Sequence, residues 1–320
     1  MNFVHDDKYF GQLIRIVAQN HRIAEALIEK DYWVTHTLWA IHETGLEIWF
    51  KGGTSLSKGF RLIQRFSEDL DLIIQPGAAG SLPAVTNWTS TNKGPVAKRN
   101  AFYEELTQQL VVPGMRIERD TTRIDSRARS ADYLGHYPGL LKAQLASAMS
   151  PFVRLEVGHA RVVPQLTIPL SSFVHDYLEE KDQIGDYTEN RPRAVRCVHP
   201  LMTLFEKLDA MTRRYERDAI EADSFVRHYE DAAQIILAID ELPELEMSAQ
   251  DLVDDMLQKN NIGALPTPDD AALLLSDSDK RDVVERAHRK IAPMFWGERI
   301  ELNDACRIIR EWLKRQDWND

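Results

Sequence analysis

The spacing of apolar residues changes twice along the chain and divides it into three parts. From about Asp7 to Glu43, apolar residues recur at helical intervals, which predicts N-terminal helices. The following part contains short β-prone runs between polar segments, which predicts a mixed α/β region. After Arg191-Pro192, apolar residues again fall on one helical face. The pattern therefore predicts two domains, 1–190 with the N-terminal helices and 191–320 as a helical C-terminal domain.

The middle part holds two short strands with an unusual polar pattern. Leu46–Phe50 alternates and is rich in β-prone residues, and Gly52–Gly53 then breaks it. Thr54–Ser55 is expected to cap a helix that runs as far as Ile63. Asp69–Ile74 is the second expected strand. Further expected elements are a helix over Val96–Val112 and strands around Gly114–Glu118, Asp132–Tyr137, Phe152–Val157 and Val162–Ile168.

Composition narrows the class of protein. The hydrophobic fraction of 43% and the charged fraction of 28% are those of a globular protein. No apolar run is long enough to span a bilayer, and the N-terminus lacks the order of a secretory signal. Cys197 and Cys306 provide neither a disulfide framework nor zinc-ligand spacing. We expect a cytoplasmic protein without a membrane partner.

Charge is unevenly distributed. The net charge of −11 disfavours a protein that coats nucleic acid without specificity. Arginines nevertheless gather in two stretches, Arg116–Arg129 and Arg191–Arg217. One interpretation is a localised basic face, and the other is scattering over solvated faces.

The two central strands carry residues suited to phosphate and metal chemistry. Gly52–Gly53 would let the backbone approach a phosphate, and the start of a helix favours an anion. On a strand, Asp69 and Asp71 share a face, and two such carboxylates favour a cation between them. Mg²⁺, with Mn²⁺ as an alternative, suits oxygen ligands shared with substrate phosphates. A Gly-Gly turn or an Asp-x-Asp alone usually has no such role, so the hypothesis depends on their combination.

These residues also carry a family resemblance. Lys51–Lys58 (KGGTSLSK) followed by Arg65–Asp71 (RFSEDLD) resembles the AbiEii/AbiGii nucleotidyltransferase toxins, within the DNA polymerase β-like superfamily. The family pattern is GGTxL and then RxSxDxD. Glu206–Ala210 with Arg213-Arg214 resembles the family's KLxA…R helix, and Arg227–Asp231 resembles its RHxxD helix. The spacer between the first two motifs is somewhat longer than in the general superfamily signature.

The resemblance implies a fold and a set of site residues. The fold would be α/β (α+β), a polymerase β-like nucleotidyltransferase core with a mixed sheet, N-terminal helices and a helical C-terminal domain. Asp69 and Asp71 would bind metal, and Glu156 is the candidate third carboxylate. Lys207 would contact phosphate, and Asp231 would act as a base or a positioning group. The implied nucleotide-binding residues are Gly52, Gly53, Thr54, Ser55, Lys58, Arg65 and Ser67.

Simpler interpretations exist for three of these residues. Lys207 lies at the edge of an apolar helical face and could be a surface lysine with a buried stem. Arg227 and Asp231 are four residues apart and could form an ordinary surface ion pair. Glu156 could face solvent.

By resemblance, the protein would transfer a nucleoside monophosphate from an NTP to an RNA hydroxyl, at the 3′ end of tRNA. It would be the toxin of a toxin–antitoxin or abortive-infection (phage-defence) system with a separate antitoxin protein. A second hypothesis keeps the chemistry but takes a protein or a small antibiotic-like molecule as acceptor. A third, a degenerate binding module, is disfavoured because both aspartates, both glycines and Lys207 are present.

Overall fold

The computed structural model describes residues 1–67, 69–75, 82–145 and 149–316. The chain packs as two units, which are described separately. Unit 1 comprises Met1–Gly59 and Ser67–Cys197, and unit 2 comprises Phe60–Phe66 and Val198–Asp320. The predicted domain boundary after residue 190 stays a prediction, because packing units need not coincide with domains.

Unit 1 is built on a mixed sheet of seven strands in the order β3-β4-β5-β2-β1-β7-β6. Strand β2 pairs antiparallel with β1 and parallel with β5, while β1 pairs parallel with β7. The sheet confirms the predicted mixed α/β architecture. The strands are β1 (Glu47–Lys51), β2 (Asp69–Gln75), β3 (Arg116–Ile124), β4 (Ser130–His136), β5 (Val153–Gly158), β6 (Gln165–Ile168) and β7 (Val195–Val198).

Helix α2 (Glu25–Glu43) organises the helical side of unit 1 and packs against α1 (Phe10–His21) and α5 (Phe173–Glu180). It is buried on almost every face, and three consecutive charged residues in it are each tied to a different segment. Glu29 accepts from the amides of residues 140 and 141, and Lys30 donates to the carbonyl of residue 150. Asp31 accepts from Lys58 and from the first amide of α5. Each of these buried charged groups is hydrogen-bonded, as burial requires, and Asp31 is also ion-paired with Lys58.

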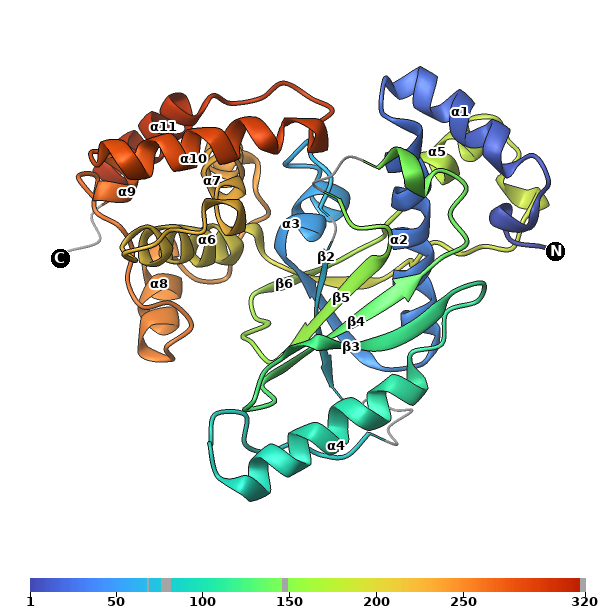
Figure 1. Cartoon of the computed structure of the whole chain (residues 1–320), viewed down its shortest axis with the longest axis horizontal. Helices are drawn as coiled ribbons and strands as arrows, with labels where there is room; N and C mark the ends of the chain where they lie inside the picture. Colours follow the sequence, from blue (N-terminus) through green and yellow to red (C-terminus); the bar gives the residue numbers. More distant parts are fainter. Residues whose placement is uncertain (68, 76–81, 146–148, 317–320) are drawn as a thin grey trace. The chain divides into compact units, whose positions relative to one another are not determined.

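Helix α4 (Lys93–Gln109) packs against β3, as Figure 1 shows. The Tyr103 hydroxyl donates to the carbonyl of Arg129, and the Tyr133 hydroxyl donates to the carbonyl of Tyr103. These bonds fix α4 to the hairpin of β3 and β4.

The helix predicted after the Gly-Gly turn is shorter than expected. Its first turn is α3 (Gly52–Thr54), and a wider helical turn over Ser55–Gly59 continues it. The helix therefore ends at Gly59, and the prediction that it reaches Ile63 is wrong. Arg61 adopts a left-handed φ of 55°, and the chain there becomes part of unit 2. Strand β7 and helix α5 were not predicted.

Unit 2 confirms the predicted helical C-terminal part. Helix α7 packs against α6 and α11 around a core that includes Phe205, Tyr229 and Ile309. The segment Phe60–Phe66 joins this unit through backbone bonds from Phe66 to the carbonyl of Met294 and from Trp296 to the carbonyl of Gln64. The helices are α6 (Pro200–Tyr215), α7 (Arg227–Leu237), α8 (Ala249–Gln258), α9 (Ala271–Leu274), α10 (Ser278–Lys290) and α11 (Leu302–Arg315).

No helix among the described residues is both long and apolar enough to cross a membrane.

A buried histidine network connects α2, α5 and the segment before β7 in unit 1. The Asn190 amide nitrogen donates to the Tyr32 hydroxyl at 3.0 Å and lies 2.9 Å from His36 Nδ1. Its carbonyl oxygen lies 2.7 Å from His175 Nε2. Burial lowers the pKa of His36 and that of His175 to about 4. Both imidazoles are therefore neutral at neutral pH.

This network predicts that the protein loses stability in mild acid. The unfolded chain takes up protons on these histidines as pH falls below about 6.5, and the folded chain does not until about pH 4. The contribution of these histidines to the unfolding free energy should therefore be fully present above pH 6.5. At pH 5 the unfolding free energy should be lower by about 2 kcal/mol per histidine. Urea titrations at pH 7.5 and 5.0 measure this loss. This loss of unfolding free energy should be smaller in a His36→Asn/His175→Asn variant. The control variant His21→Asn, at an exposed position, should show the same loss as the wild type.

Candidate active site

Gly52 lies directly against the carboxylate of Asp71. Strands β1 and β2 are antiparallel and place Lys51 opposite Asp71, so the turn after β1 begins beside this aspartate. A Cβ on Gly52 would lie 1.8 Å from Asp71 Oδ2, and the φ of Gly52 is +74°. Only glycine satisfies both conditions without strain. The Gly-Gly turn and the Asp-x-Asp strand are therefore side by side, as their spacing predicted.

Thr54 ties the same turn to the start of β2. Its hydroxyl donates to the carbonyl of Asp69 at 2.7 Å and lies 3.2 Å from that of Ser67. Ser55 is buried as well, with its hydroxyl beside the Cys197 thiol. Both side chains are thus part of the interior of unit 1, and their predicted contacts with phosphate stay predictions.

Three carboxylates share one face of the sheet beside this turn. In the parallel pair of β2 and β5, Asp69 lies opposite Arg154 and Asp71 lies opposite Glu156. Residues in register, and residues two apart on a strand, point to the same face. Burial, and then repulsion from Asp71, Asp69 and Asp132, raises the pKa of Glu156 to about 8, although its side chain is 37% exposed. The candidate third carboxylate is therefore adjacent to the Asp-x-Asp pair.

Arg154 compensates part of this negative charge from within the sheet. Its Nη1 donates to Asp120 at 2.8 Å and to Asp132 at 3.1 Å, and its Nε lies 3.8 Å from Asp69 Oδ1. The side chain of Arg154 is only 11% exposed. Hydrogen bonds from Thr122 and then from Arg154 hold the pKa of Asp120 well below its usual range, although burial acts to raise it. Sequence reasoning missed these residues, and the only local signal was that Arg154 stands two positions before Glu156.

The residues present fit a Mg²⁺ ion that shares its ligands with a substrate. Within residues 1–67, 69–75, 82–145 and 149–316, no three His, Cys, Asp or Glu side chains are grouped to hold a metal by themselves. Mg²⁺ usually takes one or two protein carboxylates and completes its shell with water and phosphate oxygens. Asp69 and Asp71 provide that pair. Their effect on the pKa of Glu156 shows the repulsion that a cation would relieve.

A second charged cluster lies inside unit 2. Asp231 on α7 is 1% exposed and accepts from Arg65 Nε and Nη2, each at 2.7 Å, and from Lys207 Nζ at 2.7 Å. Although burial acts to raise the pKa of Asp231, the charges of Arg65 and Lys207 hold it well below its usual range. The interpretations of Lys207 as a surface lysine and of Asp231 as the partner in a surface ion pair are therefore wrong. Because both of its carboxylate oxygens are engaged by Arg65 and Lys207, the geometry favours the positioning role for Asp231 over proton abstraction.

Two other residues implied to bind nucleotide are engaged within unit 1. The Lys58 ammonium is paired with Asp31 of α2, and both side chains are almost fully buried. Ser67 is buried, and its carbonyl lies beside the Thr54 hydroxyl. A contact between Lys58 and phosphate would require its ion pair to open, so its role stays a prediction. Unit 1 thus contains Gly52–Gly53 with the three carboxylates, and unit 2 contains the cluster of Arg65, Lys207 and Asp231.

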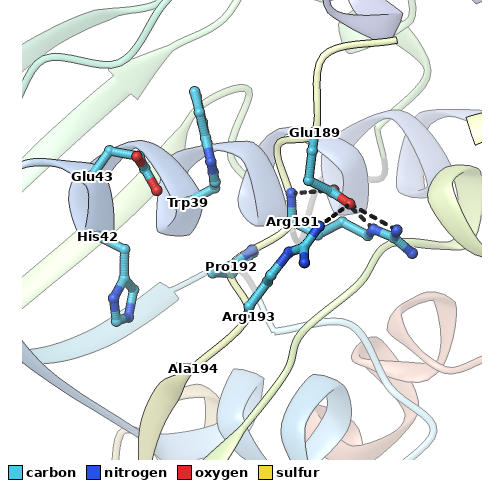
Figure 2. Close-up of a pocket in the computed structure, with 8 residues that line it drawn as sticks. All are labelled: Trp39, His42, Glu43, Glu189, Arg191, Pro192, Arg193 and Ala194. Atoms are coloured by element: carbon cyan, nitrogen blue, oxygen red, sulfur yellow. Dashed lines mark hydrogen bonds and ion pairs between the residues drawn. The ribbon is translucent and has the colours of Figure 1, made fainter. Parts of the chain in front are cut away.

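A separate pocket lies elsewhere in unit 1, and Figure 2 shows it. It is lined by Trp39, His42 and Glu43 of α2 and by residues between Glu189 and Ala194. Ala194 directly precedes β7, which runs parallel to β1. The pocket is therefore near the first residues of β1, whereas Gly52 follows its last. None of the three carboxylates lines it.

Comparison with known proteins identifies a family. The family model described as "Nucleotidyl transferase AbiEii toxin, Type IV TA system" matches residues 38–310. Among solved structures, the nucleotidyltransferase toxin MenT4 from Mycobacterium tuberculosis H37Rv is similar over 93% of this chain and 99% of that chain, with 16% identity and a TM-score of 0.38. No curated protein matches this chain. The span matched by the family model includes both charged clusters.

Gly52→Ala should damage the protein far more than an ordinary glycine substitution. The new methyl group would collide with the Asp71 carboxylate at a left-handed φ, so we expect a loss of about 2 to 4 kcal/mol in unfolding free energy. Gly94→Ala is the matched control, because no atom lies within 4 Å of a Cβ there and the site is in helix α4. It should change stability by less than about 1 kcal/mol. Equal effects of the two substitutions in urea unfolding would contradict the close approach.

Glu156→Gln should stabilise the metal-free protein at alkaline pH. Because the folded pKa of Glu156 is raised to about 8, the folded protein retains a proton that the unfolded chain loses near pH 4.5. The wild-type unfolding free energy therefore declines as pH rises between these values, and glutamine removes this decline. Thermal unfolding in chelator should show a melting-temperature difference that grows from pH 5 to pH 8.5. Glu104→Gln, at an exposed position of α4, is the control, and a difference independent of pH would contradict the proposed repulsion.

Proposed function

This chain belongs to the AbiEii family of nucleotidyltransferase toxins of type IV toxin–antitoxin systems, and from that premise we propose that it transfers a nucleoside monophosphate from an NTP to an RNA hydroxyl at the 3′ end of tRNA. The observation that carries the chemistry is the cluster of Asp69, Asp71 and Glu156 beside the Gly52 turn. The family resemblance supports tRNA as the acceptor. Membership in a type IV system implies an antitoxin and a nucleotide substrate.

The proposed reaction exchanges one phosphorus–oxygen bond for another, and the attacking hydroxyl releases its proton to solvent water. The acceptor hydroxyl attacks the α-phosphorus of the NTP, and the bond to the pyrophosphate leaving group breaks. When bound, Mg²⁺ (or Mn²⁺) would neutralise charge on the phosphates and favour ionisation of the attacking hydroxyl. Asp69 and Asp71 hold the cation in this proposal, and Glu156 completes the acidic face.

The remaining residues act by positioning. Gly52–Gly53 lets the triphosphate approach backbone amides without a Cβ clash, and Thr54 holds the start of β2 against this turn. Arg154 restrains Asp69 from the neighbouring strand. In unit 2, Asp231 holds the cations of Arg65 and Lys207 in fixed positions. The implied contact between Lys207 and phosphate belongs to the proposal and not to the observed contacts.

The proposed cellular outcome is blocked translation, relieved by a separately encoded antitoxin protein. A protein or a small antibiotic-like acceptor is the alternative, and the net charge of −11 favours a cationic one. These acceptors differ in what becomes labelled, which is RNA, protein or a small molecule.

Label transfer from each of the four α-labelled NTPs to total tRNA tests the proposal. We expect Mg²⁺-dependent labelling that falls at least about a hundredfold in an Asp69→Asn/Asp71→Asn variant, because the phosphate charge is then no longer neutralised. An Asp254→Asn/Asp282→Asn variant removes two exposed carboxylates from α8 and α10 and should label tRNA normally. Labelling of protein, or of nothing with any nucleotide, would refute RNA as the acceptor. Full labelling by the Asp69/Asp71 variant would refute the assigned site.

A further inference from the structure

The basic residues of the β3–β4 hairpin are divided between its two ends. Strand β3 is at the edge of the sheet, and most of its residues are exposed or half-buried. Arg116 lies opposite His136 at one end. At the other end, Ser130 lies opposite Gly158, two residues beyond Glu156. The hairpin end that includes Arg123, Arg127 and Arg129 is therefore the one nearer to Glu156 and Asp71, and we call it the basic tip.

Arg123 connects the basic tip to the carboxylates by loose contacts. Its Nη1 lies 3.7 Å from Glu156 Oε1 and 3.7 Å from Asp132 Oδ2, and its side chain is 61% exposed. Exposed ion pairs of this length contribute little to stability, so Arg123 can exchange them for another anion at small cost. Arg154 differs in this respect, because it is buried and bound to Asp120 at 2.8 Å.

The backbone of the basic tip is held firmly while its arginine side chains are exposed. Asp125 accepts from the amides of Arg127 and Arg129. Arg99, which is fully buried, donates from Nε and Nη2 to the carbonyl of Arg127. The Tyr103 hydroxyl donates to the carbonyl of Arg129. A rigid backbone that presents exposed cations lowers the ordering cost of binding an anionic partner.

The second arginine-rich stretch is largely engaged with the protein itself. Arg191 donates to both Glu189 and Glu179, and Figure 2 shows its contacts with Glu189. In unit 2, Arg213 is paired with Asp209, and Arg214 donates to a backbone carbonyl. Arg193 and Arg196 have looser contacts with carboxylates, at 3.6 Å each, so the first stretch is distinguished by the position of Arg123 beside Glu156.

We propose that Arg123 and Arg127 of the basic tip bind backbone phosphates of the acceptor RNA and orient its terminal hydroxyl toward the carboxylate face. This inference rests on the proposed function, because it assumes an RNA acceptor at that face. A polyanion suits the site better than a single phosphate, because the cations follow one another along a hairpin. Arg129 contributes less, since its Nε is 3.2 Å from Asp125.

Two matched double variants of the same hairpin test this surface. Arg123→Gln/Arg127→Gln removes two charges from the basic tip. Arg116→Gln/Arg119→Gln removes two charges from the first half of β3, where Arg119 contacts Glu104 of α4. Binding of 5′-fluorescein-labelled total tRNA, followed by anisotropy over a salt series, measures the effect without turnover. We expect the tip variant to bind at least about tenfold more weakly and to lose about 1.4 units of salt slope, and the control to stay within about twofold of wild type. Thermal unfolding verifies that both variants are folded.

The outcomes separate this inference from the proposed function. Equal weakening by both variants would indicate nonspecific attraction and overturn the proposal, as would no weakening by the tip variant. A tip variant that raised KM for the NTP and left tRNA affinity unchanged would assign these arginines to the nucleotide instead. If the wild-type protein labels no RNA, the proposed function fails. Selective loss of tRNA binding in the tip variant would still support the surface.

Discussion

The close contact between Gly52 and the Asp71 carboxylate is the constraint on which the candidate active site depends. A side chain at position 52 would occupy the space of Asp71 Oδ2, and the φ of +74° excludes most residues in any case. The contact requires β1 and β2 to be antiparallel neighbours, with Lys51 opposite Asp71. Thr54 then fixes the turn by bonding to the carbonyl of Asp69. For this reason, backbone amides and acidic side chains lie next to one another, at the place where the proposed function puts a metal-bound triphosphate.

The packing of Phe60–Phe66 in unit 2 accounts for the long spacer between the two motifs. The helix after the turn ends at Gly59, and Phe60–Phe66 packs as part of unit 2 before β2 begins. This detour places Arg65 on Asp231, 166 residues later in the sequence, where Lys207 provides a second positive charge. Removing one partner of such a buried cluster leaves an uncompensated charge, which typically costs about 3 to 5 kcal/mol. The spacer is therefore a structural part of unit 2.

The elements that the sequence predicted well are those whose signal is local. Strands β1 and β2 and helices α6 and α7 combine apolar periodicity with motifs, and each occurs close to its expected position. Glu156 was only a candidate third carboxylate, with a solvent-facing position as the alternative, and the pairing of β2 with β5 places it beside Asp71. The partners of charged residues could not be read in this way. The register of β3, β4 and β5 sets the contacts of Arg154 with Asp120 and Asp132. For Lys207 the sequence left a surface position open as the simpler interpretation, because its partner Asp231 is on another helix. Strand β7 has only four residues and owes its place to pairing with β1.

If an acidic protein takes the proposed polyanionic substrates, it must offset its own charge where they bind. With a net charge of −11, the carboxylate face would repel both an NTP and RNA. Arg154 offsets part of that charge permanently, because it is buried and bound to Asp120 and Asp132. If Arg154 moved away, the Asp120 and Asp132 carboxylates would lose the cation that they share and would repel one another. Arg123 is exposed and lies at a longer distance from Glu156, so it can turn toward a phosphate. Arg154 thus neutralises the internal carboxylates, and Arg123 is available for an external phosphate. One arginine could not do both, because binding a phosphate would require it to leave the internal carboxylates.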